Sequence, residues 1–230
     1  METGILSLSI MAASIGFFHT LTGPDHYVPF IMISRARNWS YIKTVVVTIL
    51  CGFGHVGSSI ILGLIGVAAG IGVSKLETVE SHRGIIASWI IIAFGLIYLI
   101  WGIYHARKKH HHHHHTLGHH HSYDLTEESE SMDKKKTNIT PWVLFIIFVF
   151  GPCEPLIPLF IYPAAQHSVM GVAAVSIIFT AVTLLTMLTI VTVSFKGLKL
   201  IKFPFFEKYT HAIAGATIMI CGLGIVFLGL

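Results

Sequence analysis

The stretch HTLTGPDHYVPF, residues 19–30, interrupts one of the most apolar parts of the chain. A Gly-Pro pair at positions 23–24 stands at its centre, and His19, Asp25 and His26 lie on either side of this pair. Proline removes a backbone N–H donor and clashes with the preceding turn, so the pair predicts a break in a helix. Irregular backbone at membrane depth survives only where it faces protein or a water-filled cavity. The stretch therefore predicts an internal polar site.

The composition places this break in a membrane protein. Of the 230 residues, 53% are hydrophobic and 11% are charged, and the mean hydropathy is +0.74. A bilayer core about 30 Å thick needs roughly 20 apolar residues per helix. Six stretches meet this requirement and predict an all-α polytopic membrane protein with six transmembrane helices. They are residues 4–33, 44–73, 84–106, 140–165, 168–195 and 211–230.

The basic residues predict how the protein is oriented, because lysine and arginine resist translocation. Of the 15, 13 fall in the first, third and fifth connections, and only Lys75 and Arg83 fall in the second. The bias predicts a multi-pass protein of the cell (inner) membrane, in contact with lipid, with both termini extracytoplasmic and the long third connection cytoplasmic. It also accounts for the net charge of +4, so no nucleic-acid partner is predicted.

An internal repeat is indicated by a second Gly-Pro, in FGPCEPLIPLFI at residues 150–161, which lies 128 residues after the first. Two glycines that are seven residues apart, Gly95 and Gly102, also match Gly222 and Gly229 at nearly the same offset. Coincidence in a glycine-rich membrane chain is the competing interpretation, since glycine commonly serves close helix packing. The shared Gly-Pro, followed in both places by an acidic residue, favours the repeat.

Each predicted half contains three spans, so the second half enters the membrane from the opposite side, as in the inverted repeats of many transporters. We therefore predict a first three-helix repeat in residues 1–106 and a second in residues 140–230. Helices 1 and 4 are expected to be broken at Gly-Pro. Residues 107–139 form the predicted cytoplasmic connection, which is histidine-rich and flexible.

Two carboxylates carry the first functional signal. Of the 11 in the chain, only Asp25 and Glu154 fall inside the six apolar stretches, one and two residues after a Gly-Pro pair. A charge at the membrane centre costs roughly 2.5–3.5 kcal/mol on insertion scales. Such residues suggest a function, although a helix-start cap would also use a carboxylate.

Histidines add specificity to this signal. His55 lies near the middle of the second stretch and joins His19 and His26 as an imidazole inside the membrane. Alone, each would be read as a hydrogen-bonded core residue. Imidazoles with carboxylates and a thiolate suit nickel, cobalt, zinc or copper better than magnesium or calcium. The predicted metal ligands are His19, Asp25, His26, His55, Cys153 and Glu154.

The third connection contains two histidine runs, residues 110–115 and 119–121, followed by acidic residues and three lysines. Low-complexity histidine of this kind predicts a solvated metal-binding tract rather than a folded site. An expression tag is the alternative interpretation, but tags lie at chain termini.

Several of these segments resemble one family. The segments GFFHTLTGPDH, FGHVGSS, FGPCEPLIPL and YTHAIAGATIMICGLGIVFLG are similar to the NicO-type nickel/cobalt transporters, including the UreH-like urease accessory membrane proteins. The resemblance implies transport of Ni²⁺ or Co²⁺ as substrate, no tightly bound cofactor and no enzymatic activity. It leaves open a metallochaperone or an energising subunit as a partner.

A second resemblance supplies an alternative function. Six-helix thiol electron carriers of the DsbD and cytochrome-biogenesis type also have inverted halves, with Pro-Cys motifs in helices 1 and 4. Their chemistry requires a cysteine from each half. Here Asp25 stands where the partner of Cys153 is expected, so Cys51 or Cys221 would have to substitute. Metal transport is therefore the predicted function, with thiol electron transfer as the alternative. No structural disulfide is predicted.

Overall fold

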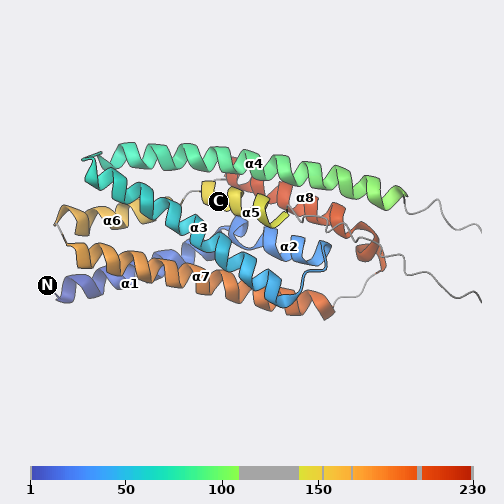
Figure 1. Ribbon diagram of the computed structural model, residues 1–230, viewed down its shortest axis with the longest axis horizontal. Coiled ribbons are helices and arrows are strands. Elements are labelled where there is room, and N and C mark those ends of the chain that lie inside the picture. The colour runs from blue at the N-terminus through green and yellow to red at the C-terminus, as the bar shows by residue number, and fades with distance from the viewer. Residues whose placement is uncertain (1, 109–139, 152, 167, 201–203, 229–230) are drawn as a thin grey trace, which may run out of the picture.

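The computed structural model describes residues 2–108, 140–151, 153–166, 168–200 and 204–228, and all regular secondary structure within these ranges is helical. Figure 1 shows the helices as a long bundle. The elements are α1 (Glu2–Thr22), the short 3₁₀ helix η1 (Pro24–His26), α2 (Val28–Ala36), α3 (Tyr41–Ala68), α4 (Val73–Lys108), α5 (Thr140–Phe150), α6 (Leu156–Ala165), α7 (Val169–Leu200) and α8 (Pro204–Leu228).

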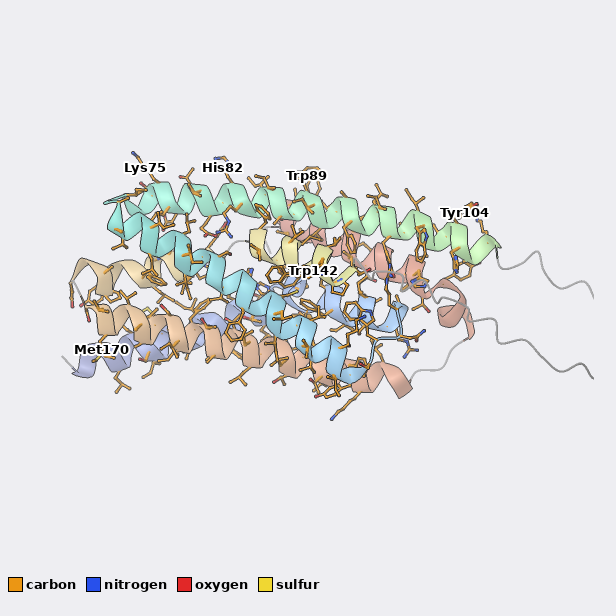
Figure 2. All side chains as sticks on the ribbon, viewed as in Figure 1. Lys75, His82, Trp89, Tyr104, Trp142 and Met170 are labelled. Carbon is orange, nitrogen blue, oxygen red and sulfur yellow. The ribbon has the colours of Figure 1, made fainter. Side chains whose placement is uncertain are left out.

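Five helices are long and apolar enough to cross a membrane, namely α1, α3, α4, α7 and α8. Helix α5 is apolar as well but has only 11 residues. Large apolar side chains are exposed over the outside of the bundle, among them Trp89, Trp142 and Met170, which are labelled in Figure 2. A surface of this kind faces lipid, and the chain is a multi-pass membrane protein.

The two predicted helix interruptions are confirmed. Helix α1 ends at Thr22, directly before Gly23, and the chain resumes as η1 and α2. Helix α5 ends at Phe150, directly before Gly151, and α6 begins at Leu156. In both places the last helical turn closes onto the glycine, whose N–H donates to the carbonyl four residues earlier at 3.0 Å and 2.9 Å. The proline that follows each glycine has no N–H and cannot donate the next helical hydrogen bond.

The start of the third long helix differs from the prediction. The apolar stretch was expected to begin at residue 84, whereas α4 begins at Val73 and includes Glu80 and Arg83. The Glu80 side chain is fully buried and forms an ion pair with Arg83 one turn later. The expectation that only Asp25 and Glu154 carry acids into the apolar segments is therefore wrong. The pairing neutralises the two charges, so this helical turn can extend the span.

The helices pack in pairs that combine the beginning and the end of the sequence. Helix α4 lies along α8, α1 lies along α7, and α3 crosses the bundle between these pairs and contacts α5, α6 and α7 (Figure 1). Two hydrophobic clusters fill the interior. One contains Phe30, Phe148 and Met187, and the other contains Phe160 and Phe179. The helix breaks lie between these clusters and carry the polar residues described below.

Glycines bring the backbones of α4 and α8 into contact. A Cβ atom on Gly95 of α4 would lie 2.5 Å from the Met219 nitrogen and 2.9 Å from the Gly215 oxygen. A Cβ atom on Gly215 of α8 would lie 2.7 Å from the Gly95 oxygen. Real Cβ atoms essentially never approach backbone atoms so closely. Gly95 was used in the sequence only as evidence for the internal repeat, and Gly215, its neighbour across the helix pair, was not singled out.

We therefore expect Gly215→Ala to destabilise the protein by about 1–3 kcal/mol, the usual cost of overpacking a close contact. The measurement is equilibrium unfolding in mixed detergent micelles. The matched control is Gly57→Ala in α3, where a Cβ atom would meet nothing within 4 Å. That change should leave stability unchanged or raise it by up to about 1 kcal/mol through helix propensity. Equal effects of the two changes would contradict the close packing of α4 on α8.

Candidate functional site

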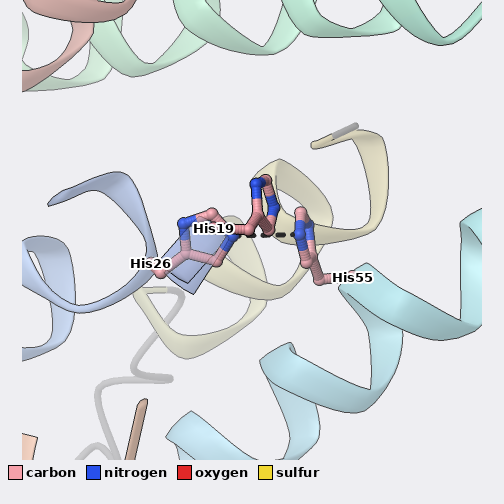
Figure 3. Close-up of side chains that lie close together, drawn as sticks. All are labelled: His19, His26 and His55. Atoms are coloured by element: carbon pink, nitrogen blue, oxygen red, sulfur yellow. Dashed lines mark hydrogen bonds between the residues drawn. The ribbon is translucent and has the colours of Figure 1, made fainter. Parts of the chain in front are cut away.

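Three histidines from separate elements meet in the interior of the protein (Figure 3). His19 lies in the last turn of α1, His26 in η1 and His55 in the middle of α3. One ring nitrogen from each residue lies within 4.8 Å of the others, and Nε2 of His26 is 3.2 Å from Nε2 of His55. His26 and His55 are buried, and His19 is partly buried. The structure thus brings together the three imidazoles predicted from sequence.

The break after α1 places two of these histidines beside each other. The chain turns at Gly23, and the His26 N–H donates to the Gly23 oxygen at 3.1 Å. This tight turn folds the His26 ring back over the glycine. A Cβ atom on Gly23 would lie 2.6 Å from Nδ1 of His26 and 2.9 Å from Oδ1 of Asp25. Glycine is therefore required here because a larger residue would displace both side chains.

Two oxygen atoms orient the His26 ring. Its Nδ1 lies 3.0 Å from the carbonyl oxygen of Gly23 and 3.1 Å from Oδ1 of Asp25. Both oxygens are hydrogen-bond acceptors when the carboxylate is ionised, so Nδ1 of His26 carries the hydrogen. Nε2 then points towards His55. Asp25, whose side chain is 25% exposed, acts here on His26 rather than as a helix cap.

The second break supplies a cysteine to the same region. Cys153 follows the end of α5 and is fully buried, and its Sγ lies 3.9 Å from Nε2 of His19. Its backbone N–H donates to Oγ of Ser59 and to Oε2 of Glu80, both at 3.2 Å. Side chains from α3 and α4 thereby hold the cysteine in place. Cys153 is the thiol that the structure brings next to the histidines.

Glu80 and Arg83 support this break through a buried polar network. Arg83 donates to Oε1 of Glu80, to Oγ of Ser58 at 2.8 Å, and to the carbonyl oxygens of Val149 at 2.8 Å and Gly151 at 3.4 Å. The last two carbonyls lie at the end of α5, where no further helical turn is present to bond them. Arg83 therefore donates to carbonyl oxygens at the end of α5, and Glu80 accepts from the Cys153 N–H at the start of the next segment.

A cavity of about 440 Å³ adjoins the site. Its lining includes His19, Asp25, His26, His55 and Glu154. Acidic side chains from both breaks therefore face one space, although Glu154 itself is exposed. The arrangement offers imidazoles, carboxylates and one nearby thiol in a partly enclosed, mostly apolar chamber.

Most of the predicted site residues are gathered here, and two residues were missed. The structure places five of the six around the cavity and Cys153 beside His19. Glu80 and Arg83 were assigned to a connection because charges end an apolar stretch. Their i, i+3 spacing next to a long apolar run was the available signal. The predicted histidine-rich tract lies outside the described residues.

The other two cysteines lie apart from Cys153 in the packing of the protein. All three cysteines belong to the described residues and are buried and free. Cys51 lies on α3 in the hydrophobic cluster around Met187, whereas Cys153 belongs to the cluster around Phe179. Cys221 lies on α8. No disulfide joins any two of these three described cysteines.

Comparison with known proteins identifies the class to which this fold and site belong. Residues 27–224 match the model of the cytochrome c biogenesis protein transmembrane region. The match covers most of the chain, and the protein belongs to this DsbD-type family. It includes His55, Cys153 and Glu154, whereas His19, Asp25 and His26 precede it. No curated protein and no solved structure matches the chain.

The family membership corrects the principal functional prediction. The NicO assignment, the UreH-like classification and the predicted transport of Ni²⁺ or Co²⁺ are wrong, because the chain belongs to the cytochrome c biogenesis family instead. The resemblance rested on short motifs of histidine, acid, glycine and proline. Such motifs indicate a polar helix break inside a membrane. Membrane proteins of different function contain breaks of this kind.

Proposed function

We propose that this protein carries reducing equivalents across the membrane by thiol–disulfide exchange at Cys153. The proposal rests on the family match over residues 27–224 together with one observation, the burial of Cys153 at a helix break beside His19. It is the function that the sequence offered as the alternative. No other catalytic reaction is proposed, in keeping with the expectation that the protein is not an enzyme.

The position of Cys153 along its span supports thiol exchange with partners from both membrane faces. Helices α5 and α6 have 11 and 10 residues, so each covers about 15 Å at 1.5 Å per residue. Neither crosses a hydrocarbon core of about 30 Å alone, but together they do. They therefore form a sixth, broken span, and Cys153 lies about halfway along it. A thiol at this depth is equally distant from both surfaces.

Carriers of this type use a cysteine from each half, but Cys51 and Cys221 lie apart from Cys153 in this protein. The proposed exchange therefore uses Cys153 alone, and the donor supplies the second thiol. The Cys153 sulfur attacks one sulfur of a partner's disulfide as the thiolate, forming a mixed disulfide, and the proton of the Cys153 thiol passes to the partner thiolate that is released. A thiol of a dithiol donor then attacks the Cys153 sulfur, and the partner leaves with two thiols. The donor's second thiol displaces Cys153, and the donor becomes a disulfide. Two electrons pass from the donor to the partner.

The pairing of the helices supports the inverted repeat that alternating access would use. Helix α2 lies mainly against α8 and α6 mainly against α7, but α1 of the first broken span packs along α7 and α5 of the second packs along α3. The last two are reciprocal contacts between halves, with the predicted boundaries at residues 1–106 and 140–230. Rocking of one half against the other would open a path from Cys153 to the cytoplasmic face while the outer partner is still bonded to its sulfur.

The orientation follows from charge. We propose that the end with the basic connections is cytoplasmic and that both termini are extracytoplasmic. The dithiol donor then acts from the cytoplasm and the disulfide acceptor from the outer face. Lipid surrounds the bundle, and no nucleic-acid partner is proposed.

The function is tested in sealed vesicles that contain the purified protein and an enclosed membrane-impermeant dithiol. A membrane-impermeant disulfide reporter is added outside. We expect the reporter to be reduced when the protein is present, while vesicles without protein or with no enclosed dithiol stay inactive. A rate equal to that of protein-free vesicles, with the protein shown to be folded and inserted, would contradict the proposed function.

A further inference from the structure

The three imidazoles have no part in the proposed thiol exchange, and two of them precede the family match. We propose that His19, His26 and His55 form a binding site for one transition-metal cation of the Zn²⁺ class, retained by the protein. This proposal goes beyond the proposed function, and neither requires the other. It rests on the geometry of the three rings and on the charges around them.

The hydrogen bonds of the rings leave two lone pairs facing each other. Nδ1 of His26 uses its hydrogen on the oxygens of Gly23 and Asp25. His55 hydrogen-bonds the carbonyl oxygen of Phe148. Its Nδ1 faces this oxygen, because Nδ1 of His55 and the Phe148 oxygen both lie next to Gly151. A neutral imidazole has one N–H, so both Nε2 atoms are acceptors. Two acceptors at 3.2 Å repel unless a cation lies between or beside them.

The distances suit tetrahedral coordination. Zinc binds imidazole nitrogen at about 2.0–2.1 Å, so two nitrogens of a tetrahedral site lie about 3.3 Å apart. The His26 and His55 nitrogens are 3.2 Å apart. The third imidazole, from His19, lies within 4.8 Å and would complete the set by moving closer. The fourth position would face the 440 Å³ cavity, which His19, His26 and His55 line.

The surrounding charges suit a divalent cation. Neutral imidazoles bring no charge, and an uncompensated divalent ion inside a membrane protein would be costly. The same cavity is lined by two carboxylates, Asp25 and Glu154, one from each helix break. Asp25 also bonds Nδ1 of His26, the arrangement in which a carboxylate orients a metal-binding histidine. Imidazole donors favour zinc or copper over magnesium and calcium.

The test measures Zn²⁺ binding to the purified full chain in detergent. The histidine runs at residues 110–115 and 119–121 would bind Zn²⁺ themselves, so their nine histidines are replaced by glutamine in every protein compared. We expect one tightly bound ion per chain, an X-ray absorption spectrum of three imidazoles, and a higher melting temperature with Zn²⁺. No stoichiometric ion, or a spectrum without imidazole ligands, would overturn the proposal and leave a shared proton between His26 and His55.

Variants assign the ligands. His55→Ala should abolish the bound ion, and His19→Gln, at a partly buried position, provides the same test if His55→Ala does not fold. Asp25→Asn should weaken binding by about 10- to 100-fold. The matched control, His82→Ala on the exposed side of α4, should bind normally. Cys153→Ser should also keep the ion, which separates this proposal from electron transfer. Binding that survives both ligand variants would overturn the proposal.

Discussion

Replacement of Cys153 by serine is expected to abolish electron transfer in the sealed-vesicle assay. Serine is close to cysteine in size, so the fold should persist. The hydroxyl cannot form a disulfide, and the exchange has no other sulfur at the helix break beside His19. We expect the rate to fall to that of protein-free vesicles. The rate of reporter reduction is the measurement.

The matched controls are the other two cysteines. Cys51→Ser and Cys221→Ser replace buried, free cysteines of the same chain, but these lie on α3 and α8 rather than at the break. Both variants should transfer electrons at the parent rate. Loss of transfer in either one would contradict the single-cysteine exchange. It would favour a dithiol between Cys153 and that residue.

Arg83→Leu is expected to have the largest effect on stability, a loss of about 3–5 kcal/mol. Removing one member of a buried ion pair leaves the other charge unpaired, which accounts for a cost of this size. Here Glu80 is fully buried, and the change also leaves the Val149 and Gly151 carbonyls without their donor. Equilibrium unfolding in mixed detergent micelles measures the effect.

Two further variants show whether the pair is responsible. The Arg83→Leu, Glu80→Leu double variant should be more stable than Arg83→Leu alone, because it no longer buries a lone carboxylate. Lys75→Leu removes an exposed cation near the start of the same helix, visible at the surface in Figure 2. It should change stability by less than about 0.5 kcal/mol. An equal loss in Lys75→Leu and Arg83→Leu would contradict the network at the α5 break.

The helices and their breaks followed from local physics. Runs of about 20 apolar residues match the thickness of the bilayer, and the pair Gly23 and Pro24 is typical of a helix end. The long helices and the break could therefore be predicted. The start of α4 could not be found by hydropathy alone. Glu80 and Arg83 lower the mean hydropathy, and only the folded structure shows that they neutralise each other inside the protein.

The residues of the site could be predicted from the sequence, but the function of the protein could not. His19, His26 and His55 were recognised because imidazoles are rare inside apolar helices, and the fold does bring them together. The function of the protein was misassigned as Ni²⁺ or Co²⁺ transport because histidines and carboxylates at a helix break suit several membrane functions. The role of Cys153 depended on its packing beside His19, which joins residues 134 positions apart in the chain.

The most direct test of the account uses the Cys51→Ser, Cys221→Ser double variant, in which Cys153 is the sole thiol. In sealed vesicles this variant should sustain electron transfer, and a membrane-impermeant maleimide should label Cys153 both when added outside and when enclosed within. Labelling from one face only, or none from either face, would contradict a carrier that presents Cys153 to both sides of the membrane.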